Sequence, residues 1–132
     1  MQGVRIIPIE PAYKKENGMF VFKADMYDDL MTFPIAERSV IYMPPLQYGG
    51  NHSHPRTEAF IALGEDAEFH WIDDEGQKHI EPMFQDSKLQ IFIVYPQTPH
   101  AIINASANAS ATIIEYASEA QNLEDVVREQ VI

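Results

Sequence analysis

The sequence predicts an all-β domain, a sandwich or barrel, because short strand-like runs dominate it and no long helical pattern separates them. A parallel α/β architecture would need such helical patterns between its strands. No internal repeat is visible. The expected strands, in chain order, are residues 4–9, 19–23, 39–43, 59–63, 68–72, 78–80, 89–95, 100–104 and 112–117.

Turn-forming residues bound these runs, and this is the second observation behind the prediction. Proline ends a strand because it cannot donate to the ladder, and Asn-Gly pairs favour tight hairpin turns. A small polar run, residues 104–112, separates the last two strands. The other turn signals, in order, are Pro11, Asn17-Gly18, Pro44-Pro45, Gly64, the acidic residues 73–76, Pro82 and Pro96.

A short C-terminal helix is expected to follow the last strand. Asn122 is a suitable N-cap, and Glu124 and Arg128 form an i,i+4 pair. A weaker helical pattern covers residues 25–31. The apolar face of the C-terminal helix would consist of Leu123, Val126, Val127 and Val131.

Length, charge and composition narrow the class of protein. The 132 residues suit one domain, residues 1–132. The absence of cysteine excludes disulfides, thiolate metal sites and cysteine nucleophiles. A net charge of −11 argues against nucleic acid and anionic membranes as partners. Residues 1–11 lack the apolar core of a signal peptide, so we expect a cytoplasmic protein.

Four residues of the sequence are candidate ligands of one metal ion. His52 and His54 are two residues apart, so in an extended strand both imidazoles point to the same face. Glu58 follows a bend at Pro55 and can return to face them from a neighbouring strand. His100, which follows a rigid Pro-containing bend, is a fourth candidate.

Three imidazoles and one carboxylate suit a divalent transition metal: iron, manganese, nickel, cobalt, copper or zinc. Such a set leaves positions free for substrate or water on an octahedral ion. A lone His-x-His pair could as well be two surface histidines. The prediction therefore depends on Glu58, Gly64 and His100 occurring at suitable positions as well.

Residues 49–64 resemble the first cupin motif, in which glycine precedes His-x-His, then Glu and a closing Gly. Residues 90–104 resemble the second motif, in which Pro precedes His and then Asn, although Thr98 stands where that motif usually has glycine. The resemblance implies a double-stranded β-helix, or jelly-roll barrel. It also implies metal ligation by His52, His54, Glu58 and His100. Some cupins instead use these histidines as acid/base groups without metal.

A substrate pocket is expected beside the metal. Phe60 shares strand parity with Glu58, and Ile102 shares it with His100, so both should line the cavity. Arg56 is either an anion-binding residue or a solvated loop residue, and Tyr48 is a further pocket candidate. Gln47 and Glu115 are candidate polar groups of the cavity. His70 is either solvent-exposed or pocket-lining, and exposure is the favoured alternative.

Three classes of function remain open. The first is a metal-dependent isomerase, epimerase or lyase of carbohydrate metabolism, acting on a sugar or sugar acid. Residues 51–63 resemble cupin domains of polysaccharide-biosynthesis enzymes, and residues 115–119 resemble sugar-nucleotide ketoisomerases, which rely on histidine rather than a full metal set. The others are an iron(II) dioxygenase and a non-enzymatic small-ligand-binding protein. A homodimer that pairs through residues 4–9 is also expected.

Overall fold

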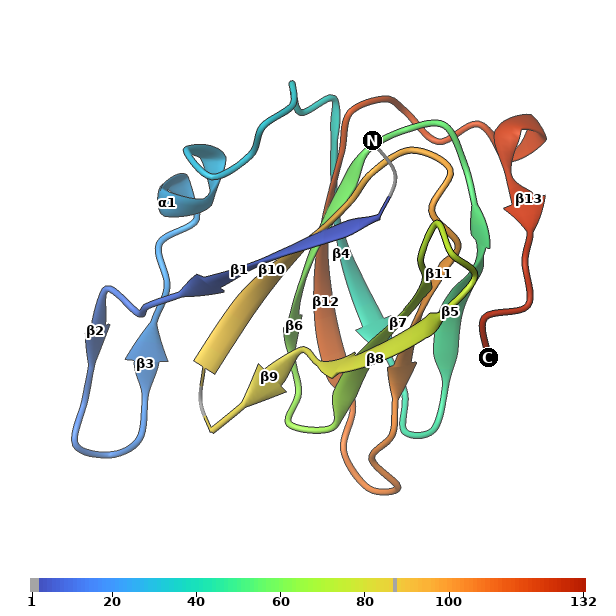
Figure 1. Cartoon of the computed structure of the whole chain (residues 1–132). Coiled ribbons are helices and arrows are strands. Elements are labelled where there is room, and N and C mark those ends of the chain that lie inside the picture. Colours follow the sequence, from blue (N-terminus) through green and yellow to red (C-terminus); the bar gives the residue numbers. More distant parts are fainter. Residues whose placement is uncertain (1–2, 87) are drawn as a thin grey trace.

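The computed structural model describes residues 3–86 and 88–132, and it consists mainly of two antiparallel sheets that enclose a core (Figure 1). The first sheet has the order β1-β10-β6-β12-β4, with β9 paired to β10, and the second has the order β13-β5-β11-β7-β8. The first sheet comprises β1 (Val4–Ile9), β4 (Glu37–Met43), β6 (Glu58–Leu63), β9 (Phe84–Gln85), β10 (Lys88–Val94) and β12 (Ala111–Ala117). The second comprises β5 (Tyr48–Ser53), β7 (Ala67–Ile72), β8 (Lys78–Pro82), β11 (His100–Asn104) and β13 (Val127–Arg128).

The core between the sheets is aromatic and aliphatic. Phe92 on β10 stacks on Phe69 of β7, with ring centroids 4.9 Å apart, and both side chains are fully buried. Burial of one such side chain stabilises the fold by about 1.5–3 kcal/mol. Ile113 on β12 belongs to the same cluster. Strands from both sheets therefore contribute inward-facing residues to one core.

The outer face of the first sheet is also partly covered. A hairpin of β2 (Tyr13–Lys14) and β3 (Phe20–Val21), followed by the short helix α1 (Asp25–Asp28), lies beside this sheet (Figure 1). Phe20 of the hairpin stacks on Phe84, and Tyr27 of α1 is buried in a second apolar cluster with Ile61. Burial on both faces explains why β6 and β10 read as continuous apolar runs rather than alternating ones.

The all-β prediction is confirmed, and the expected strands are present with boundaries shifted by a few residues. The C-terminal helix is shorter than expected. It is a single 3₁₀ turn, Leu123–Asp125, in which the Asn122 side chain accepts a hydrogen bond from the backbone N–H of Glu124 at 3.1 Å. The chain then becomes β13, because pairing with β5 satisfies its backbone groups instead.

No helix in residues 3–86 and 88–132 has the length and apolar character needed to cross a membrane.

Candidate functional site

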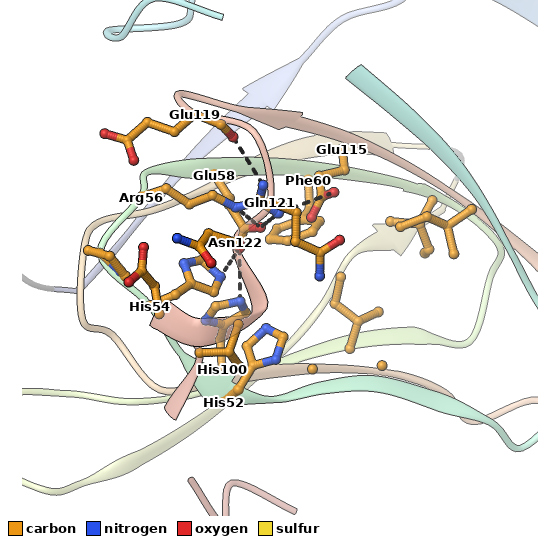
Figure 2. Close-up of a pocket in the computed structure, with 18 of the residues that line it drawn as sticks. His52, His54, Arg56, Glu58, Phe60, His100, Glu115, Glu119, Gln121 and Asn122 are labelled. Carbon is orange, nitrogen blue, oxygen red and sulfur yellow. Dashed lines mark hydrogen bonds and ion pairs between the residues drawn. The ribbon is translucent and has the colours of Figure 1, made fainter. Parts of the chain in front are cut away.

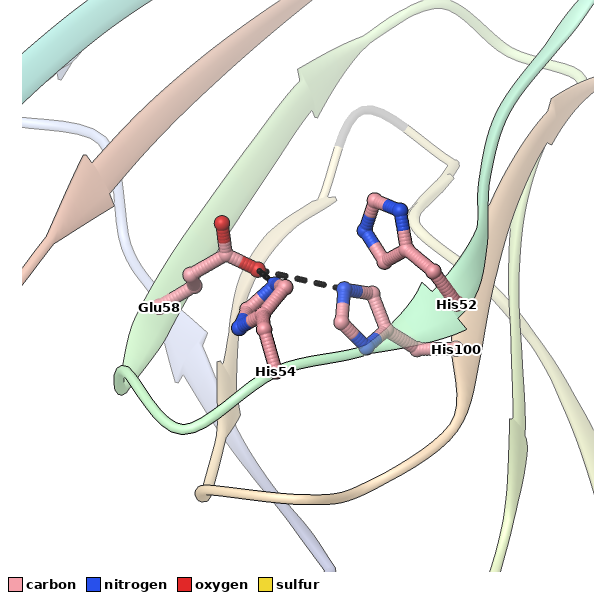
Figure 3. A group of neighbouring side chains, drawn as sticks. All are labelled: His52, His54, Glu58 and His100. Atoms are coloured by element: carbon pink, nitrogen blue, oxygen red, sulfur yellow. Dashed lines mark ion pairs between the residues drawn. The ribbon is translucent and has the colours of Figure 1, made fainter. Parts of the chain in front are cut away.

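The four predicted metal ligands converge in the structure (Figure 2 and Figure 3). Their potential ligand atoms all lie within 4.8 Å of one another. The three imidazole ring centroids are 5.0–5.2 Å apart. His54, Glu58 and His100 are buried, at 5%, 1% and 2% exposure, and His52 is half-buried.

Strand geometry brings these side chains together. His52 lies near the end of β5 and His100 begins β11, and the two residues are register partners in the second sheet. Glu58 begins β6 in the first sheet. The bend at Pro55 carries the chain from one sheet to the other, so the carboxylate faces the imidazoles as expected from the sequence.

A β-bulge in β5 decides which residues face the site. His100 pairs with His52 but Ala101 pairs with Gly50, so Asn51 is an extra residue. Gly50 and Asn51 both have positive φ, 89° and 67°. A Cβ on Gly50 would lie 2.9 Å from the His100 carbonyl oxygen, and only glycine permits so close an approach.

Hydrogen bonding fixes the ring of His100. Its Nδ1 lies 2.8 Å from the Thr98 carbonyl oxygen, which can only accept, so Nδ1 carries a proton and donates. In the neutral ring, Nε2 then presents a lone pair toward Glu58 Oε1, which is 3.1 Å away. Thr98 itself is buried and bonds the backbone N–H of Gly3 at 2.7 Å.

Three buried atoms of the cluster, on His54 and Glu58, lack hydrogen-bond partners among the residues that the structure describes. His54 Nε2 is 2.7 Å from Glu58 Oε1, but the angles are not those of a hydrogen bond. Both atoms, and His54 Nδ1, have no hydrogen-bond partner among the described residues. Buried polar atoms left unpaired are costly. Converging lone pairs of this kind fit a positive species, either a proton or a metal ion.

Arg56 holds the other side of the Glu58 carboxylate (Figure 2). Its Nε and Nη2 donate to Glu58 Oε2 at 3.1 and 2.7 Å, and its Nη1 donates to the Glu119 carbonyl oxygen at 3.1 Å. Glu37 and Glu115 carboxylates lie 3.5 and 3.8 Å from the same guanidinium. The interpretation of Arg56 as a solvated loop residue is therefore wrong, because the side chain is only 9% exposed and orients Glu58.

Burial and neighbouring groups shift three pKa values at the site. Burial alone would raise the pKa of Glu58, but its contacts with His100 and His54 outweigh this and hold the pKa well below its ordinary range. Burial lowers the pKa of His52 to about 4, and the neighbouring His100 and His54 act in the same direction. Burial and the adjacent Glu58 carboxylate raise the pKa of Glu115 to about 8. His52 is therefore neutral, with a lone pair free to bind a cation, at neutral pH.

A cavity of about 230 Å³ adjoins the cluster. Arg56, Phe60, Ile102 and Glu115 line it, as do apolar residues of β4 and β12. Sequence reasoning did not anticipate the contribution of residues 119–122, 125 and 126, which form one wall. No local signal marks them, because they reach the site through the pairing of β13 with β5.

Three other candidates lie elsewhere. Tyr48 is 57% exposed and, like Gln47, is not among the residues lining the cavity; the bulge at Asn51 reverses strand alternation between Tyr48 and His52. The expected exposure of His70 is wrong. Its side chain is buried in β7, an interior strand, and lies 3.1 Å from the Glu68 carboxylate.

Comparison with known proteins links the chain to others through its structure. No protein-family model matches the chain, and no curated protein matches it in sequence. It is similar to a 3,4-ketoisomerase from Helicobacter canadensis, with a TM-score of 0.73, 15% identity and coverage of 98% of this chain and 92% of that one. It is also similar to QdtA, a sugar 3,4-ketoisomerase from Thermoanaerobacterium thermosaccharolyticum in complex with TDP, with a TM-score of 0.67, 15% identity, and coverage of 96% and 88%.

A third similar structure is RmlC, the dTDP-6-deoxy-D-glucose-3,5-epimerase of Legionella pneumophila, in complex with dTDP-4-keto-L-rhamnose. The TM-score is 0.65 and the identity 16%, over 94% of this chain and 76% of that one. At these identities the likeness concerns the fold. The chain shares with these proteins the jelly-roll barrel fold of two antiparallel sheets.

Proposed function

We propose that this protein binds one divalent transition metal through His52, His54, Glu58 and His100 and is an isomerase, epimerase or lyase acting on a sugar or sugar acid. The observation that carries the metal proposal is the convergence of these ligand atoms, with atoms of His54 and Glu58 left without hydrogen-bond partners in the described part of the chain. Support for a sugar comes from the similar folds, which include two sugar ketoisomerases and a sugar epimerase.

The residues around the cluster suit a working rather than a closed site. Arg56 fixes Glu58 Oε2 and leaves Oε1 toward the histidines, and the Thr98 carbonyl fixes the tautomer of His100. Phe60 and Ile102 form apolar walls that reduce water access. When bound, a divalent metal would polarise a carbonyl or hydroxyl group of the substrate.

Elemental analysis of untagged protein tests the metal proposal. We expect about one equivalent of a transition metal in the wild type, none in the His52→Ala/His54→Ala variant, and an unchanged content in a control, His79→Ala. His79 is a partly exposed histidine that bonds Asp73, outside the cluster. Iron would direct attention to the dioxygenase alternative. Absence of metal after reconstitution would overturn the proposal and favour acid/base chemistry by the histidines.

Proton exchange with solvent tests the enzyme class. Isomerases and epimerases of this kind move a proton on the carbon beside a carbonyl group. We therefore expect metal-loaded protein in heavy water to place deuterium at that carbon of a ketose or keto-sugar, and the double histidine variant to place none. Incorporation at equal rates with both proteins would contradict the assignment.

A further inference from the structure

The lining of the cavity changes from polar to apolar along three strands. On each of them, the lining residue nearer the four-residue cluster is polar, and the residue two positions further in, on the same face of the strand, is apolar. The pairs are Glu58 and Phe60 on β6, His100 and Ile102 on β11, and Glu115 and Ile113 on β12. The polar groups of a bound ligand must therefore gather at the end of the cavity that holds the cluster.

Most polar side chains at this end, outside the cluster, are already bonded within the protein. Arg56 bonds Glu58 through Nε and Nη2 and the Glu119 carbonyl oxygen through Nη1. Glu115 lies 3.8 Å from Nη2 of the same guanidinium. The Glu119 carboxylate points away from the cavity (Figure 2), and the side-chain oxygen of Asn122 accepts a backbone hydrogen bond of the 3₁₀ turn. These groups shape the site and have little capacity left for a ligand.

Gln121 differs from these residues because its side-chain amide is free. It lines the cavity, and Figure 2 shows its side chain extending into the site, with no dashed line reaching the amide. A primary amide carries two donors and one acceptor, so it can bond a hydroxyl group in either direction. Asp125, which also lines the cavity, is an exposed carboxylate and can only accept.

The backbone of Gln121 is held in place relative to the cluster. Its N–H donates to Glu37 Oε2 at 3.1 Å, and Glu37 Oε1 lies 3.5 Å from Nη1 of Arg56. The nearby Glu119 carbonyl oxygen bonds the same Arg56, which in turn bonds Glu58 of the cluster. An exposed segment is thus anchored at two points to the buried site, and such anchoring reduces the entropy lost when a ligand binds.

We infer that Gln121 is a substrate-binding residue of this cavity, whose amide hydrogen-bonds a hydroxyl group of a sugar that lies between it and the four-residue cluster. The apolar residues deeper in the cavity then face the carbon–hydrogen groups of the same molecule. The inference rests on the proposed function and adds to it a residue outside both sequence motifs, residues 49–64 and 90–104.

Calorimetric titration of sugars into the protein, in the metal state in which it is purified, tests the inference. The probes are four monosaccharides: D-glucose, D-galactose, D-mannose and D-xylose. We expect at least one of them to bind, and Gln121→Leu to weaken that binding by about three- to tenfold, the contribution of one hydrogen bond. Gln130→Leu makes the same change at an exposed position outside the cavity and should leave the affinity unchanged.

Monodeoxy analogues of the sugar that binds most tightly show whether Gln121 contacts it directly. With the wild type, removal of the hydroxyl group that Gln121 bonds should weaken binding by about three- to tenfold. With Gln121→Leu, the same removal should have almost no effect, because the partner amide is already gone. If the two losses multiplied for every analogue, Gln121 would not contact the sugar, and the inference would be overturned.

The metal content of each variant is measured separately and should not change, because Gln121 is not among the proposed ligands. Equal affinity of the wild type and Gln121→Leu for a bound sugar would overturn this inference and leave the proposed function intact. Failure of all four sugars to bind metal-loaded protein would overturn the sugar class of the proposed function, and this inference with it. Sugar binding that depends on Gln121 in protein without metal would keep the inference and overturn the metal centre.

Discussion

Arg56 is the residue that joins the candidate site to the C-terminal segment. Its guanidinium is buried between the Glu58 carboxylate and the Glu119 carbonyl oxygen. Removing one partner of a buried ion pair typically costs about 3–5 kcal/mol, because the other charge is left uncompensated. We expect a loss of this size in the free energy of unfolding of Arg56→Ala, measured by urea denaturation without metal.

Arg56→Lys is the matched variant, since it keeps the charge but loses the bidentate contact with Glu58. The free energy of unfolding of Arg56→Lys should lie between those of the wild type and Arg56→Ala. A loss below about 1 kcal/mol in Arg56→Ala, the size typical of surface pairs, would contradict the buried role.

The free energy of unfolding should depend on pH through the carboxyl group of Glu115. Its pKa is about 8 in the folded protein, against an ordinary 4.5, so between these values the folded state binds more protons than the unfolded state. Stability contributed by the protonated form is therefore lost as the pH rises through this window. Glu115→Gln, which stays uncharged, should gain stability relative to wild type as the pH rises from about 5 to about 9.

The measurement is urea denaturation of both metal-free proteins at several pH values. Glu65→Gln, at an exposed position in the turn between β6 and β7, is the control and should follow the wild type. Parallel curves for wild type and Glu115→Gln would show that the Glu115 pKa is not raised in the folded protein.

Sequence reasoning at the residue scale succeeded where spacing decides geometry. His52, His54, Glu58 and His100 form one cluster, as predicted from the two motifs. The sequence left open whether Arg56 binds an anion or is a solvated loop residue, because the groups that bury its guanidinium include Glu37 and Glu119, which are distant in the chain. Tertiary contacts of this kind leave no local pattern.

Among the elements, β5 carries the most specific backbone requirement. The bulge at Asn51 needs positive φ at Gly50, where a Cβ would also approach the His100 carbonyl oxygen to 2.9 Å. We expect Gly50→Ala to lower stability by about 1–3 kcal/mol and to weaken metal binding, since His100 must shift. Unfolding curves and metal titration measure the two effects.

Gly49→Ala is the control for this prediction. Gly49 has no positive φ, and a Cβ there would meet only the Met43 side chain, at an ordinary 3.6 Å. The Gly49→Ala substitution should lower the free energy of unfolding much less than Gly50→Ala does. Equal losses in the two variants would mean that the bulge does not depend on glycine.

The same bulge limited prediction of the pocket. Tyr48 is the pocket candidate that this affects: it precedes His52 by four residues, but the one extra residue between them reverses the alternation and turns Tyr48 away from the cavity. The C-terminal segment shows a related limit. Asn122 capped a turn as predicted, yet the apolar pattern that follows suits a helix or a strand, and pairing with β5 selected the strand.

At the scale of the whole molecule, the two edge strands of the first sheet are where a second copy of the chain could pair. The homodimer expected from residues 4–9 stays a prediction; β1 pairs with β10 of its own chain and is the edge strand of the first sheet. At the opposite edge, β4 exposes Val40 and Tyr42, at 77% and 70%. Light scattering at micromolar concentration should give the mass of a dimer, and a monomer would contradict the prediction.

Metal binding should also be visible in the stability of the whole molecule. A ligand that binds only the folded state stabilises it by about 2.7 kcal/mol at 100 times its dissociation constant. We expect added metal to raise the Tm of the wild type and a chelator to lower it. Neither should affect His52→Ala/His54→Ala, and an equal metal response in that variant would point to binding elsewhere.

The reason for this coupling lies in the origin of the four side chains. His52 and His100 belong to the second sheet, whereas Glu58 belongs to the first, so an ion held by all of them would fasten one sheet to the other. The chain has no cysteine and so no covalent cross-link to do this. The heat resistance of the protein would then vary with the free metal concentration around it. In a metal-starved environment the protein would stay folded for a shorter time, whether or not the metal also takes part in a reaction.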